Sequence, residues 1–255
     1  ATTGARLIVA LESDGHLMGS EYATKSEPTL KADVTGTAPL EKVELFRGLE
    51  CIGQAPLDVR PAPNRVRIQW AGSSRMMSYS GVVWDGSLRV QGATIKEVDG
   101  QRFDSPRSSI TGQDEQNLQW QVWGCGYPMA IDMELEFDDA AAVSLELAVG
   151  TRLITGPCFG GHGETGPMRI SLAPAEQCTI RAGLAEIQQQ AQEYSLGALD
   201  RVIRIGPTPI CHQAETSWEI RDDSPQAGWQ PYWIRVIQQD LEMAWSSPVF
   251  VDYVD

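Results

Sequence analysis

A glycine-rich segment that contains a histidine and a glutamate is the part of the sequence best suited to chemistry. In residues 156–167 (GPCFGGHGETGP), Gly160 and Gly161 precede His162, and Glu164 follows it two residues later. Glycines let backbone amides approach an anion, and a histidine with a carboxylate can ligate a metal ion. No Gly-Lys-Ser/Thr follows, however, so the segment is not a phosphate-binding loop. Because glycine and proline are also typical of hairpin loops, we prefer that simpler interpretation.

The two other histidines do not form a catalytic group with their neighbours. His16 belongs to the segment DGH at 14–16, and an Asp-Gly pair predicts a hairpin turn. His212 follows Cys211, but adjacent residues of a strand point to opposite faces and cannot act together as a dyad. The sequence contains neither Gly-x-Ser-x-Gly nor His-Glu-x-x-His. We therefore predict no catalytic residue and no metal site in this chain.

Two acidic pairs lie where strands are expected to end, at residues 138–139 and 222–223. Aspartate is favoured in turns, so we interpret both pairs as turn residues. A calcium site would need a spaced series of oxygen ligands, and no such series follows either pair.

Tryptophan is abundant, with eight residues in the chain. Trp70 and Trp120 alternate in phase with Ile68 and Val122, which predicts that both indoles lie in the core. Trp123 is out of phase with this pattern and is expected on the surface. Exposed aromatic rings on an acidic β-sandwich are a means of stacking sugars, so the residue suggests a carbohydrate-binding module.

The elements that must position these residues are strands. Apolar and polar residues alternate with a period of two, which is typical of strands with one buried face in antiparallel sheets. The clearest segments are residues 30–34, 42–45, 66–70, 118–122, 131–137, 143–149, 232–236 and 249–251. Helical spacing is scarce, and the best candidate is residues 184–194, between Gly183 and Gly197, where we expect one short helix.

Two proline-rich breaks, at residues 61–64 and 206–209, divide the strands into groups. We predict an all-β fold of two β-sandwiches. The outer one is Ig-like and discontinuous, formed by residues 1–62 and 206–255, and residues 63–205 form a second sandwich inserted into it.

The two ends of the chain should pair with each other. The alternating segments 30–47 and 232–251 are both short, and neither has another obvious partner across the breaks. We therefore expect them to share one sandwich.

Composition excludes several classes of protein. The 34 acidic and 20 basic side chains give a formal net charge of −14, which repels nucleic acid and anionic membrane surfaces. No stretch approaches the ~18 apolar residues of a spanning helix, so we expect a soluble protein without membrane contact. The five cysteines include no Cys-x-x-Cys pair, which argues against a zinc knuckle and favours buried thiols, with one or two disulfides left open.

Segments at both ends resemble a known family. They are ATTGAR at 1–6, GHLMGSE at 15–21, APLEKVELFRG at 38–48, YWIRV at 232–236 and MAWSSPVFV at 243–251, with VWDGSL at 83–88 as a looser match. These blocks resemble the C-terminal β-rich region of a bacterial domain-of-unknown-function family related to PHP-type metal-dependent phosphoesterases. In that family a metal-binding barrel precedes the matching region. The resemblance implies that a catalytic barrel lies upstream of Ala1 in the same polypeptide.

The resemblance implies an accessory role. No position of this chain matches the family's metal ligands, so divalent metals would belong to the parent protein and no cofactor to this chain. We expect a non-catalytic region that packs on the barrel, shapes access to it or mediates a homo-oligomer. The alternative is the carbohydrate-binding module, and an enzyme in its own right has the least support. A bacterial source is implied, with cytoplasm and periplasm both left open.

Overall fold

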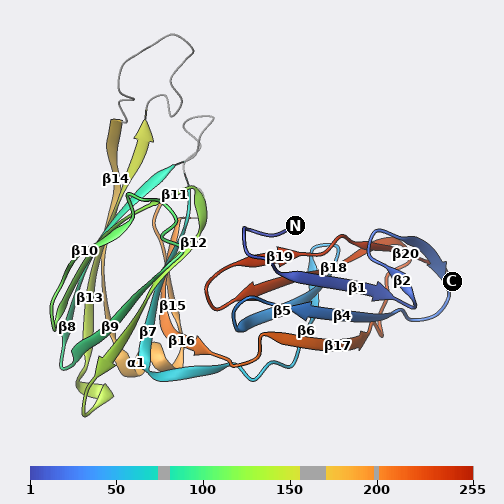
Figure 1. Cartoon of the computed structure of the whole chain (residues 1–255), viewed down its shortest axis with the longest axis horizontal. Helices are drawn as coiled ribbons and strands as arrows, with labels where there is room; N and C mark the ends of the chain where they lie inside the picture. The colour runs from blue at the N-terminus through green and yellow to red at the C-terminus, as the bar shows by residue number, and fades with distance from the viewer. Residues whose placement is uncertain (74–80, 156–170, 198–200, 255) are drawn as a thin grey trace, which may run out of the picture. The chain divides into compact units, whose positions relative to one another are not determined.

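The chain is described by a computed structural model that covers residues 1–73, 81–155, 171–197 and 201–254 (Figure 1). Strands account for 65% of the structure and helices for 4%, in several sheets without a barrel, so the predicted all-β sandwich class is confirmed. No helix in the described part of the chain is long and apolar enough to cross a membrane.

The chain divides into two compact units. Unit 1 comprises residues 1–60 and 209–255, and unit 2 comprises residues 61–208. The proline-rich breaks indicate boundaries at 62/63 and 205/206, and contacts within the structure place them at 60/61 and 208/209.

Unit 1 is built from two sheets, with strand orders β17-β4-β1-β2 and β3-β20-β18-β5-β6, and β19 pairs with β18. All pairings are antiparallel except that of β20 with β3, which is parallel. The strands are β1 (Ile8–Ser13), β2 (His16–Leu17), β3 (Glu21–Thr24), β4 (Thr29–Thr35), β5 (Leu40–Arg47), β6 (Glu50–Gln54), β17 (Glu215–Arg221), β18 (Gly228–Gln238), β19 (Met243–Trp245) and β20 (Val249–Tyr253).

The two ends of the chain interleave in both sheets of unit 1. β5 pairs with β18 so that Leu45 lies opposite Ile234, and β4 pairs with β17 so that Ala32 lies opposite Trp218. The predicted pairing of segments 30–47 and 232–251 is confirmed. The pairing is possible because the alternation on all four strands sends apolar side chains to one shared core.

A buried polar network also joins the two ends. Arg47 Nη1 donates to Asp222 Oδ2 at 2.9 Å, and the Tyr232 hydroxyl donates to the same oxygen at 2.7 Å. Burial, and then the hydrogen bond to the Asp222 carboxylate, raise the pKa of Tyr232. Asp222 is 5% exposed, so this residue of an expected turn pair is instead a buried partner of Arg47. Because a buried charge needs a partner, strand β5 and the end of β17 are held in one arrangement.

Unit 2 is built from two five-stranded sheets, with orders β10-β11-β8-β13-β14 and β15-β16-β7-β12-β9. Its elements are β7 (Arg60–Gly72), β8 (Val82–Gln91), β9 (Thr94–Gln101), β10 (Ser109–Gln113), β11 (Asn117–Gly124), β12 (Gly126–Glu136), the 3₁₀ helix η1 (Ala140–Ala142), β13 (Ser144–Thr155), β14 (Ser171–Gly183), α1 (Leu184–Gln189), β15 (Gln192–Ser195) and β16 (Val202–Ile210).

Tryptophan dominates the core of unit 2. Trp70, Trp84 and Trp120 are each at most 2% exposed, which confirms the core positions predicted for Trp70 and Trp120. The rings of Trp70 and Trp120 stack with centroids 5.7 Å apart. Trp120 lies directly across from Gly86 on β8, and its indole occupies the space that a Cβ at Gly86 would need. Both sheets therefore contribute large rings to one core, and a glycine makes room for one of them.

The expected helix at residues 184–194 is only partly correct. α1 ends at Gln189, and Tyr194 lies on β15, where it pairs with Ile203 of β16. Leu184 and Ile187 are the only buried residues of the helix, so one turn suffices to place both in the core. The remaining residues gain more from sheet hydrogen bonds than from a longer helix, because isolated short helices are marginal in water.

Candidate functional site

The sequence-predicted site residues fall into two groups in the structure. Gly160, Gly161, His162 and Glu164 lie outside the described residues. Trp123 lies on β11 and is partly exposed, in agreement with its position out of phase with the buried residues.

Trp123 is held in place by its neighbours on the outer face of the sheet β10-β11-β8-β13-β14. Its indole Nε1 lies 3.4 Å from Gln121 Oε1 and donates to it, and its backbone N–H donates to Ser108 Oγ at 3.0 Å. The guanidinium of Arg107 lies over the ring at 5.0 Å from its centroid. The cation and the ring attract each other, which helps to fix the orientation of the indole. The residue is thus a fixed aromatic platform on a polar surface.

A network of hydrogen-bonded polar side chains extends from Trp123 across the sheet. Gln121 Nε2 donates to Asp85 Oδ1 at 3.1 Å, so the amide of Gln121 bridges the indole and the carboxylate. Arg152 on β13 donates to both oxygens of Asp85, from Nε at 2.5 Å and from Nη2 at 2.7 Å. The side chains of Arg152 and Asp85 are 30% and 39% exposed, so this bidentate pair faces solvent.

Beside the Asp85–Arg152 pair lies a hollow of about 550 Å³. The outward positions of β13 alternate with the buried residues Leu145, Leu147 and Val149, and the small residues Ala148 and Gly150 occupy two of them in succession. Longer side chains stand on the neighbouring strands, so a depression forms over β13. We call it the β13 hollow, and its lining side chains are Asp85, Ser87, Ala148, Arg152, Gln177 and Thr179, with Gly150 at its floor.

The β13 hollow presents hydrogen-bonding groups of both kinds. Ser87 and Thr179 carry hydroxyls that donate and accept, and Gln177 carries an amide. The arrangement can bind a polar molecule through several hydrogen bonds, with an aromatic surface nearby. Sequence reasoning finds Trp123 but misses this group, although two small residues in succession on the polar face of a strand, in ELAVGTR at 146–152, are a visible signal.

Unit 1 carries a different surface, which is mainly apolar. On β18 the buried residues alternate with Trp229, Pro231 and Trp233, which therefore lie on the outer face of the sheet β3-β20-β18-β5-β6. Phe46 of β5 stacks on Trp233 with centroids 4.3 Å apart, and Phe250 of β20 lies opposite Pro231. We call these five residues the aromatic face. Trp229 is 54% exposed, so part of the face is open to solvent.

Charge at the aromatic face is paired internally. Arg235 donates from Nε to Glu44 Oε2 at 2.8 Å, and its guanidinium lies 5.1 Å from the centroid of the Phe46 ring. The indole Nε1 of Trp233 donates to the carbonyl of Gly48 at 2.8 Å. The polar groups of this surface are thus used within the unit, which suits the face to apolar contact.

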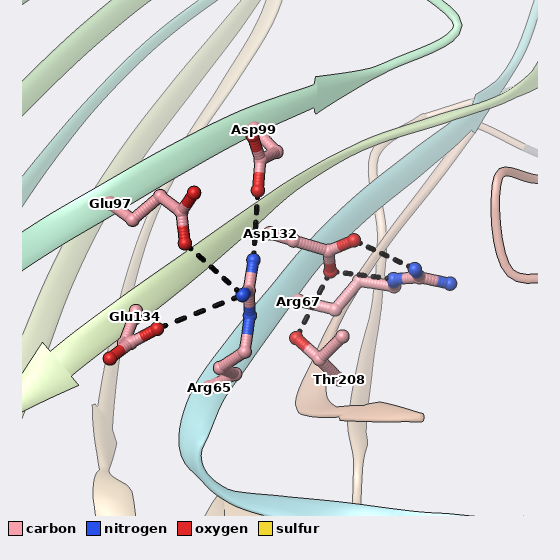
Figure 2. Close-up of polar contacts among 7 residues, drawn as sticks. All are labelled: Arg65, Arg67, Glu97, Asp99, Asp132, Glu134 and Thr208. Carbon is pink, nitrogen blue, oxygen red and sulfur yellow. Dashed lines mark hydrogen bonds and ion pairs between the residues drawn. The ribbon is translucent and has the colours of Figure 1, made fainter. Parts of the chain in front are cut away.

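A third cluster, on the outer face of the sheet β15-β16-β7-β12-β9, has a structural interpretation. Asp132 is 3% exposed and accepts hydrogen bonds from Arg67 Nε at 2.8 Å and from Thr208 Oγ1 at 3.0 Å. Figure 2 shows these contacts and, beside them, Arg65 reaching from β7 to three carboxylates on β9 and β12. The three are Glu97, Asp99 and Glu134, at 3.3, 2.8 and 3.7 Å. The ion pairs tie β7, β12 and β9 together, and the hydrogen bond from Thr208 adds β16.

The two other histidines and the acidic pair at 138–139 are also candidates from the sequence, and the structure shows where they lie. His16 follows the Asp14-Gly15 turn, as predicted, and stacks on Tyr22 with centroids 4.1 Å apart. His212 is exposed between β16 and β17. Asp139 caps η1 by accepting a hydrogen bond from Ala141 N at 2.9 Å. Among the residues that the structure describes, no three His, Cys, Asp or Glu side chains gather as a metal site would require.

The expectation of buried thiols is correct for only part of the set: among the cysteines in the described residues, Cys51 and Cys125 are exposed. Cys211 is buried, and Cys178 packs against the core of unit 2. Burial raises the pKa of the Cys178 thiol, which disfavours the reactive thiolate form.

Comparison with known proteins adds no family to this description: no protein-family model and no curated protein matches the sequence.

Proposed function

We propose that this chain is a non-catalytic accessory region of a larger PHP-like metal-dependent hydrolase, and that it packs on the catalytic barrel of the same polypeptide. In this proposal the divalent metals and the phosphoester chemistry belong to the barrel. The chain shapes or supports the entrance to that site.

The proposal is supported by the positions of the segments that resemble the PHP-related family. Residues 38–48, 232–236 and 243–251 come from opposite ends of the chain, yet they contribute to β5, β18, β19 and β20 of one sheet. Residues 15–21 form β2 of the other sheet of unit 1 and reach β3 only at Glu21. The outer side of the sheet that contains β18 is the aromatic face. A partly exposed apolar surface that includes tryptophan is typical of a protein contact site.

The test compares the chain with a longer polypeptide that carries the proposed barrel before Ala1. The chain alone should hydrolyse neither phosphomonoesters nor phosphodiesters with added manganese or zinc, whereas the longer polypeptide should hydrolyse one of them. Elemental analysis should find stoichiometric metal only in the longer polypeptide. Turnover by the chain alone would contradict the proposal.

A pair of variants of the longer polypeptide tests the packing surface. Trp229→Ser removes the exposed indole of the aromatic face and should speed proteolysis between barrel and accessory region. Leu49→Ser is the matched control, because Leu49 is 96% exposed on the β5–β6 turn and belongs to no apolar face. Equal proteolysis of both variants and the parent would show that the aromatic face is not the contact.

A second candidate function is carbohydrate binding by unit 2. The specific observation is the position of Trp123, whose indole is fixed by Arg107 and Gln121 beside the polar β13 hollow. Aromatic stacking combined with a few placed polar groups is the usual chemistry of a small-ligand site.

This candidate is tested by tryptophan fluorescence. Acrylamide should quench Trp123, and soluble polysaccharides should shift the emission of the chain but not that of a Trp123→Ala variant. If Trp123→Ala responds as fully as the parent, Trp123 is not a sugar platform.

A further inference from the structure

The β13 hollow has a shape that its own sequence creates. Ala148 faces outward between Ser87 on one side and Thr179 on the other, and Gly150 lies in the same way between Asp85 and Gln177. Neighbouring strands lie about 4.8 Å apart, so the hollow is two strand spacings wide and open above. Its floor is small side chains and backbone, and its walls are hydroxyl, amide and charged groups.

The charge in the walls is balanced. The guanidinium of Arg152 is neutralised by a bidentate bond to Asp85, with N–O distances of 2.5 and 2.7 Å. Arg152 retains N–H groups beyond the two that bind Asp85, since a guanidinium has five. The pair therefore supplies donors without a net positive charge, and the net charge of −14 further disfavours an anionic ligand. A neutral molecule with many hydroxyls fits this pattern, because each hydroxyl both donates and accepts.

The aromatic platform lies beside one end of the hollow. Trp123 of β11 lies opposite Val83 of β8, which lies opposite Arg152 of β13, so the backbone at Trp123 and the backbone at Arg152 are roughly 10 Å apart. Gly150 and Ala148 lie farther along β13, so the floor of the hollow is more distant from the indole. Val83 lies between Trp123 and Arg152 and is fully buried although it points to this outer face. The side chains of the outer face thus cover the intervening strand and join platform and hollow into one surface. A ligand that uses both must be longer than a single sugar unit.

We propose that this surface binds a neutral oligosaccharide, with one sugar unit in the β13 hollow hydrogen-bonded to the Asp85–Arg152 pair and a second on Trp123. The inference rests on the second proposed function and adds the ligand class and the residues that select it. A uronic acid or a phosphorylated sugar would meet a carboxylate at Asp85 and no uncompensated cation in the hollow.

The experiment measures binding of defined hexasaccharides by isothermal titration. The neutral probes are cellohexaose, xylohexaose, mannohexaose, laminarihexaose and maltohexaose, and the anionic probe is hexagalacturonate. At least one neutral probe should bind with a Kd of about 1 mM or tighter, and hexagalacturonate should bind at least about tenfold more weakly.

Two variants then locate the site. Ala148→Leu fills the hollow while leaving every polar group in place, and should weaken binding of the neutral probe at least about tenfold. Ser144→Leu is the matched control, because Ser144 is exposed on the same strand and face but lies outside the hollow. It should bind as the parent does. Gly150→Val serves as a second plug if Ala148→Leu fails to fold, since a Cβ at Gly150 would meet only the flexible side chain of Gln177, at 3.4 Å.

The outcomes distinguish a failure of the neutral-oligosaccharide inference from a failure of carbohydrate binding as such. Binding of hexagalacturonate as tight as that of every neutral probe would overturn the neutral-ligand inference and leave carbohydrate binding standing. Equal binding by Ala148→Leu and Ser144→Leu would remove the hollow from the site. No binding of any probe at millimolar concentration would overturn both the inference and the second proposed function.

Discussion

Gly86 lies beneath the indole of Trp120 in the middle of β8, and its lack of a side chain is a packing requirement. Gly86→Ala would place a Cβ 2.1 Å from two carbons of the indole, so β8 or Trp120 must shift. Overpacking of this kind costs about 1–3 kcal/mol of unfolding free energy. Urea unfolding followed by fluorescence measures the change.

Gly150→Ala is the control for this prediction. Its Cβ would make an ordinary contact of 3.4 Å with Gln177, and alanine lowers the entropy of the unfolded chain. The control should therefore be neutral or more stable by about 0.5–1 kcal/mol. A Gly86→Ala variant as stable as the control would refute the packing account of Gly86.

The buried pair of Asp132 and Arg67 in unit 2 should have a large effect on stability. The Asp132 carboxylate is buried, and Arg67 and Thr208 donate to it. Arg67→Met leaves the buried charge with the Thr208 hydroxyl as its remaining donor among the described side chains, and breaking such a pair costs about 3–5 kcal/mol. The double variant Arg67→Met with Asp132→Leu removes both charges and should recover most of the loss. A double variant no more stable than Arg67→Met would mean that the pair itself, not the orphaned charge, sets the cost.

At the scale of elements, the β1–β2 hairpin and β3 are joined through Tyr22. Its hydroxyl lies 2.7 Å from Ser13 Oγ and donates to Asp14 Oδ2 at 3.0 Å. Burial, opposed by the hydrogen bond from Ser13 and aided by Asp14, raises the pKa of Tyr22 to about 12. The protonated form is thus favoured by folding.

This shift predicts a pH dependence with a definite sign. A group whose pKa is raised in the folded state contributes stability in full below its unfolded pKa of about 10, and loses it as the pH rises through the folded value. The melting temperature should therefore fall between pH 10 and about 12. The fall should be shallower in Tyr22→Phe, which cannot lose a proton, than in Tyr253→Phe, a control on β20 of the same unit. Parallel curves for the two variants would exclude Tyr22 as the cause.

The strands also show how far period-two alternation in the sequence predicts which side chains lie on the surface. Period-two alternation correctly places Trp70 and Trp120 in the core and Trp123 on the outer face, because strand side chains alternate strictly. The same pattern at β13 exposes Ala148 and Gly150. It does not reveal that they form a hollow, since that depends on the taller side chains of β8 and β14.

At the scale of the whole molecule, the two units differ in how the chain builds them. Unit 2 is one continuous segment with its own core, whereas unit 1 needs strands from both ends. Deleting residues 228–255 removes β18 and β20 and should unfold unit 1, leaving a cooperative unfolding transition from residues 61–208. Limited proteolysis with mass spectrometry identifies the surviving fragment. A stable fragment that ends near Pro61 would show instead that the N-terminal strands fold alone.

The sequence by itself determined the all-β class, the buried side of the strands that alternate clearly, and the discontinuous layout marked by two proline-rich breaks. These properties are local: they follow from alternation and from turn residues within a few positions of each other.

Only the tertiary structure decided which strands are neighbours. Asp85 and Arg152 are 67 residues apart in the chain and pair because β8 and β13 are adjacent. Asp222 shows the same limit: its local sequence is typical of a turn, yet it is buried against Arg47, 175 residues away. Long-range pairing depends on the summed burial of whole sheets, and no single segment of the sequence contains that information.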